Sequence, residues 1–94
     1  MIWEYLAGEL SVRLGDLQAA TAKAAANDVA RLRRQVESGP LAALGWATAR
    51  ALALADSLCW ESLACGDTAA FARQAAISAD LRLFGACAGL LAEE

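Results

Sequence analysis

The side chains best suited to acid–base catalysis and metal binding are scarce in this sequence. Histidine, the usual general base near neutral pH and the commonest metal ligand, is absent from all 94 residues. The three cysteines, Cys59, Cys65 and Cys87, form no CxxC pair, which is the spacing of many zinc sites and redox disulfides. We therefore expect no catalytic residue, cofactor, metal site or internal disulfide, and we expect all three cysteines to be buried thiols.

One carboxylate and two tryptophans are the remaining candidates for a binding site. Asp56 lies at residues 53–58, in the middle of the most apolar of the expected helices, where a carboxylate can belong to a ligand site. Trp46 and Trp60 fall on roughly one side of the same expected helix. Packing in a core or an interface explains the two rings more simply than a ligand pocket does. Asp56, Trp46 and Trp60 remain the candidate ligand-site residues, and the alternative for Asp56 is a solvated strip of the helix.

Net charge and hydropathy limit the classes of partner. The formal net charge of −3 argues against general nucleic-acid binding, which normally requires a basic surplus. The longest uncharged run, residues 38–49, is far shorter than the ~20 apolar residues that a membrane span needs. Glu4 follows the first apolar residues almost at once, unlike the basic and then apolar leader of a signal peptide. The sequence thus predicts a soluble cytoplasmic protein that binds neither nucleic acid nor membrane nor metal.

We expect the candidate site residues to lie on helices. Alanine supplies 25 of the 94 residues, and it is the strongest intrinsic helix former. No alternating apolar and polar run of the kind that forms strands is present. A glycine followed by a proline predicts a turn at Ser38–Pro40, and a glycine followed by an aspartate N-cap predicts another at Cys65–Thr68. These turns divide a single domain, residues 1–94, into helical segments 2–37, 40–65 and 67–92.

The first segment carries an apolar residue at every third or fourth position from Trp3 to Val36. Because this stripe keeps its phase across Gly15, we predict one continuous helix. The fold class is then all-α, an antiparallel three-helix bundle with an overlong first helix. Alternatively, Gly15 and Asp16 end one helix and cap the next, which gives four helices with a break near Gly15.

Helix lengths and apolar surface together predict self-association. At 1.5 Å per residue the first helix would be roughly 50 Å long and each of the others roughly 38 Å. Its first turns would extend past the bundle and expose an aromatic cluster, which usually marks an interface. In a two-fold dimer each cluster lies on the neighbouring bundle; alternatively, the start of the chain folds back onto its own bundle. The predicted interface residues are Ile2, Trp3, Tyr5 and Leu6, with Leu83 and Leu90 on a second face of the last segment.

These observations favour a non-catalytic function. We predict a helical protein–protein interaction or adaptor module that forms a homodimer and that can also bind another protein. The first alternative is a carrier or sensor of a small apolar ligand, with a pocket between helices lined by alanines and Trp46 or Trp60. The second is a small helical enzyme that acts on an anionic metabolite through Asp56, Glu61 and arginine side chains.

Overall fold

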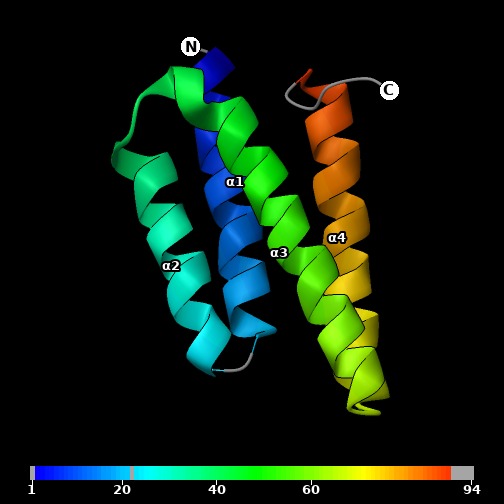
Figure 1. The fold of residues 1–94 in the computed structure, drawn as a ribbon. Coiled ribbons are helices and arrows are strands. Elements are labelled where there is room, and N and C mark those ends of the chain that lie inside the picture. The colour runs from blue at the N-terminus through cyan, green and yellow to red at the C-terminus, as the bar shows by residue number, and fades with distance from the viewer. Residues whose placement is uncertain (1, 22, 90–94) are drawn as a thin grey trace.

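The computed structural model of the chain describes residues 2–21 and 23–89, which form four α-helices and one short 3-10 helix (Figure 1). Successive helices run antiparallel, and the described residues contain no strand. The all-α class and the turns predicted at Ser38–Pro40 and Cys65–Thr68 are confirmed. Within the described part of the chain, no helix is long and apolar enough to cross a membrane. The elements are α1 (Ile2–Ala19), α2 (Lys23–Ser38), η1 (Leu41–Ala43), α3 (Leu44–Ala64) and α4 (Thr68–Cys87).

The first segment forms two helices, so the predicted long first helix and the three-helix bundle are wrong. The chain turns between α1 and α2, whereas Gly15 lies inside α1. The alternative of four helices is therefore right, but its position for the break is wrong. The Ala20 N–H and the Thr21 hydroxyl both donate to the Leu17 carbonyl oxygen, which closes the last turn of α1.

Both halves of the first segment bury the same apolar stripe. In one straight helix this stripe would extend over about 40 Å, longer than any other helix of the chain could cover. Folding the segment into a hairpin brings its two halves face to face, and each half keeps its stripe toward the core. The buried residues are Leu10, Leu14 and Leu17 on α1 and Val29, Leu32 and Val36 on α2.

The α1–α2 hairpin packs beside the α3–α4 hairpin through one shared core. α3 contributes the fully buried Ala51 and Ala55, whose small side chains let neighbouring helices approach closely. α4 contributes the fully buried Leu81. At the edge of this core, the Arg13 guanidinium of α1 lies 4.5 Å from the centroid of the Phe84 ring on α4.

The molecule is flat. The principal extents of its Cα trace are 42 × 28 × 16 Å. α1 and α3 contact each other in the middle, whereas α2 and α4 occupy opposite sides (Figure 1). One surface of α3 and α4 therefore faces away from α1 and α2, and no described helix covers it.

The two predicted turns are held by local geometry. Gly66 has a φ of 76°, in the left-handed region that favours glycine, and it follows the end of α3. The Asp67 carboxylate then caps α4, because its Oδ1 accepts a hydrogen bond of 3.0 Å from the Ala70 N–H. At the other turn, a Cβ atom on Gly39 would collide with the Gln35 carbonyl oxygen, so that the tight turn after α2 requires glycine.

Candidate functional site

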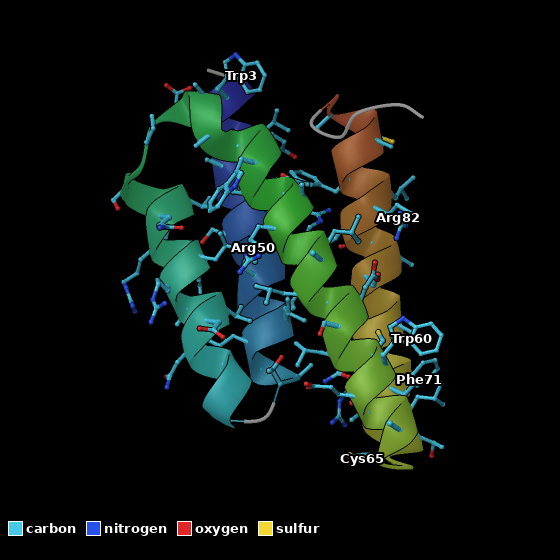
Figure 2. The ribbon with its side chains drawn as sticks, viewed as in Figure 1. Trp3, Arg50, Trp60, Cys65, Phe71 and Arg82 are labelled. Carbon is cyan, nitrogen blue, oxygen red and sulfur yellow. The ribbon has the colours of Figure 1, made fainter. Side chains whose placement is uncertain are left out.

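A shallow hollow of about 330 Å³ lies between α3 and α4, on the surface that faces away from α1 and α2. Trp60, Phe71 and Arg82 lie on this side of the hairpin (Figure 2). We call this surface the outer face and define it by Asp56, Cys59, Trp60 and Leu63 of α3 and by Phe71, Ala75, Ser78, Ala79 and Arg82 of α4.

α4 carries apolar residues on two sides. One side, which includes Ala70 and Leu81, is buried in the core. The other includes Ala79 and Leu83, and the Leu83 side chain is 64% exposed. A helix at the edge of a bundle needs only one apolar stripe for its own fold. The second stripe is therefore not explained by the packing of this chain.

A polar cluster lies at the end of the outer face that is farther from the turn at Gly66. Asp56 Oδ1 accepts a hydrogen bond from the Ser78 hydroxyl, and Asp56 Oδ2 lies 3.3 Å from Arg82 Nη2. Both carboxylate oxygens thus have partners within the chain, and the cluster links α3 to α4. Because Asp56 is only partly buried, it belongs to the surface of the hairpin and not to an apolar core.

The three candidate ligand-site residues do not form one pocket. Trp60 shares the outer-face hollow with Asp56. Trp46 lines a different hollow of about 280 Å³, where the end of α2 meets the start of α3 beside Pro40. The two indoles are 70% exposed at Trp60 and 58% exposed at Trp46, so neither belongs to the core.

The cysteines differ in their surroundings. Cys59 is buried at the edge of the outer face, and burial, followed by the nearby Asp56 carboxylate, raises the pKa of its thiol. It is therefore protonated near neutral pH, which makes it a poor nucleophile. The prediction that all three thiols are buried is wrong for Cys65 and Cys87, which are exposed because they lie at the ends of α3 and α4. The described residues contain no group of three side chains suited to a metal ion.

The prediction of an amino-terminal interface rests on a first helix that extends past the bundle. The described residues contain no such helix. α1 folds against α2, and Leu6 packs against the core of its own chain. Trp3 and Tyr5 are exposed at the start of α1. Leu83 is exposed on α4. The Ile2 side chain and the whole of Leu90 lie outside the described part of the structure. Contact through these residues stays a prediction.

Gln74 is a structural residue that the sequence analysis missed. Its buried amide bridges the two hairpins: Oε1 accepts a 2.6 Å hydrogen bond from the Ser62 hydroxyl, and Nε2 donates to the Ala20 carbonyl oxygen at 3.1 Å. Gln74 precedes Ser78 by four residues and Leu81 by seven, so it shares their face of α4. That spacing was the available signal.

The outer face offers an apolar surface with a polar cluster of no net charge at one end, which suits contact with another molecule better than bond-making chemistry. Its carboxylate and hydroxyl are bonded to each other, and its thiol has a raised pKa. Comparison of the chain with protein-family models, with curated proteins and with solved structures found no match.

Proposed function

We propose that this chain is a non-catalytic helical interaction module whose outer face binds a helical surface of another polypeptide. One observation carries the proposal: the exposed Trp60 and Leu63 line one hollow of the α3–α4 hairpin together with Phe71. Monomeric proteins rarely leave large continuous apolar patches in water, and those that do generally use them for binding. Tryptophan at such a position is typical of residues that dominate binding energy.

The polar groups of the outer face support binding over catalysis. Asp56, Ser78 and Arg82 satisfy one another, which lowers the cost of covering them with a partner. An enzyme acting on an anion would instead need convergent cations, and the Arg82 guanidinium is already paired with Asp56.

The compartment that fits this module best is the cytoplasm. Cys65 and Cys87 are free and exposed on the surface. Exposed free thiols persist in reducing compartments and are readily oxidised in secreted proteins. The function is therefore proposed for a reducing environment.

Carriage of a small apolar ligand is a second candidate, favoured by the hollow beside Trp46. Its volume of about 280 Å³ is just below the usual range for ligand pockets, about 300–1,000 Å³. A variant that keeps Trp46 as its one tryptophan, with Trp3 and Trp60 changed to phenylalanine, can be titrated with a fluorescent apolar dye. A saturable blue shift of Trp46 emission would support this candidate, and an unchanged spectrum would oppose it.

Site-specific photo-crosslinking in cells tests the proposed function. A photoreactive phenylalanine analogue replaces Trp60 in one variant and Trp46 in a matched control, because both tryptophans lie on α3 and are similarly exposed. We expect an adduct of discrete mass from position 60 and none from position 46. Equal adducts from both positions, or none from position 60, would contradict the assignment of the outer face as the binding surface.

A further inference from the structure

We infer that the groove between α2 and α3 binds a small monocarboxylate with an apolar tail. Two hollows lie in this groove. One, of about 280 Å³, includes Pro40 and Leu44 in its lining, and we call it the apolar hollow. The other, of about 250 Å³, includes Arg31 and Arg50, and we call it the charged hollow. Neither shares a described lining residue with the outer face, so the inference goes beyond the proposed interaction module. It rests on the second candidate function, to which it adds a charged group on the apolar ligand.

The two hollows lie end to end along the groove. Because α2 and α3 run antiparallel, residues 35–39 at the end of α2 lie beside the start of α3, and residues 28–32 lie farther along it. The apolar hollow occupies the first of these places and the charged hollow the second. Gln35 and Trp46 line both hollows. One ligand that lies along the Trp46 ring can therefore occupy both.

The apolar hollow suits a hydrocarbon tail. Its lining includes three buried core residues, Val36, Leu44 and Ala47, together with Pro40. Proline has no N–H group that a hydrocarbon would leave without a hydrogen bond. The Trp46 side chain is exposed beside these residues, so a tail that covers it removes apolar surface of both molecules from water.

The charged hollow has one more positive than negative side chain. It is lined by the Arg31 and Arg50 guanidinium groups and by one carboxylate, that of Asp28. Arg31 and Asp28 are 4.0 Å apart and exposed, which makes a weak ion pair. Arg50 lies on the side of α3 that faces α2 (Figure 2), and no ion pair or hydrogen bond to the described residues occupies its guanidinium. A ligand with one carboxylate matches this excess charge, and a guanidinium can donate two parallel hydrogen bonds to it.

The spacing along α3 sets the length of the ligand. Trp46 and Arg50 are four residues apart, so they lie on the same side of the helix. From Ala43, which lines the apolar hollow, to Arg50 is a rise of about 10 Å at 1.5 Å per residue. An extended chain advances roughly 1.2 Å per bond, as a polypeptide backbone does, so about eight bonds cover this distance. Octanoate has this length.

Equilibrium dialysis of the full chain against octanoate and against octanol tests the two parts of the site separately. The two probes have the same tail, and only octanoate carries a charge. We expect octanoate to bind saturably with a Kd below about 1 mM, and octanol to bind at least about fivefold more weakly. Acetate, which has the charge without the tail, should not displace octanoate.

Two pairs of variants assign the binding to the groove. Arg50→Gln should weaken octanoate binding at least about fivefold and leave octanol binding unchanged, which also shows that the variant is folded. Arg34→Gln, the matched control, removes an exposed arginine of α2 that lines neither hollow and should change neither affinity. Trp46→Ala should weaken the binding of both probes. Trp60→Ala, on the same helix, should weaken neither.

The possible results separate this site from the proposed function. Absence of saturable octanoate binding up to about 2 mM overturns the inference. Equal affinity of the wild type for octanoate and octanol, or an Arg34→Gln variant as weak as Arg50→Gln, overturns the anion site, also in the event that Trp46→Ala fails to fold. Failure of position 60 to cross-link contradicts the interaction module alone, because Trp60 lines neither hollow.

Discussion

Gly15 lies inside α1, next to the Arg33 side chain of α2. A Cβ atom at this position would lie 3.0 Å from Nη1 of Arg33, which extends across α1 from α2. The same guanidinium donates from Nε to the Ser11 hydroxyl at 3.1 Å, and Ser11 donates to Glu37 at 3.0 Å. The missing side chain thus makes room for a polar link between α1 and α2, and it does not mark the end of a helix.

Replacement of Gly66 by valine should destabilise the chain by about 1 kcal/mol or more, because a β-branched residue is strained at positive φ. The φ of Gly66 is 76°, and open space surrounds its Cα, so steric crowding by neighbours adds nothing to the effect. Urea denaturation of wild type and variant measures the difference in free energy of unfolding.

Gly8 provides the matched control. It lies in the middle of α1 with open space around it, so Gly8→Ala should stabilise the chain by about 0.5–1 kcal/mol through helix propensity. If Gly66→Val unfolds at the same urea concentration as the wild type, the left-handed turn is wrong.

At the scale of elements, a buried amide holds the turn between α1 and α2 against the other hairpin. The Gln74 side chain of α4 donates to the Ala20 carbonyl oxygen in that turn and accepts from Ser62 on α3. One side chain therefore connects three elements. The contact lies at the break of the first segment and connects it to α3 and α4.

Gln74→Leu should lower the free energy of unfolding by about 1–3 kcal/mol, because the Ala20 carbonyl and the Ser62 hydroxyl lose their partner in a buried place. Gln35→Leu on the exposed side of α2 is the control, and such surface substitutions usually change stability by no more than about 0.5 kcal/mol. Chemical denaturation monitored by circular dichroism compares the two. Equal stability of both variants would show that the amide bridge contributes nothing.

At the scale of the whole molecule, the two hairpins share one core and should unfold together. Leu14 of α1 and Leu81 of α4 are both fully buried in that core. The Cα radius of gyration of 12.8 Å agrees with the value of about 12 Å expected for a compact domain of this length. Neither hairpin by itself could bury these leucines.

Two single-tryptophan variants can measure this cooperativity. One keeps Trp3 on α1 and the other keeps Trp60 on α3, with the remaining tryptophans changed to phenylalanine. We expect both signals to follow the same urea transition at a fixed protein concentration. Leu14→Ala should shift both together, by about 2–5 kcal/mol. Separate transitions for the two probes would mean that the hairpins fold independently.

The sequence alone determined the all-α class and the two turns at Ser38–Pro40 and Cys65–Thr68. These features depend on local chemistry: alanine propensity, a glycine at positive φ, and an aspartate side chain that caps the next helix. Each acts over a few residues, so the local sequence contains all of the information that it needs.

The tertiary structure decided where the first segment folds and which apolar surfaces stay exposed. The residues around Thr21 include no glycine or proline, and the apolar stripe keeps its phase, so no local signal marks the break. The chain turns there because the turn lets Leu10 and Leu14 become buried in the core. The residues that cover them are far away in sequence. For the same reason periodicity could not tell which of the two apolar sides of α4 would enter the core, or that Trp46 and Trp60 would line separate hollows. The helical period of the sequence shows which residues lie on the same side of a helix. What covers that side is decided by packing against other helices.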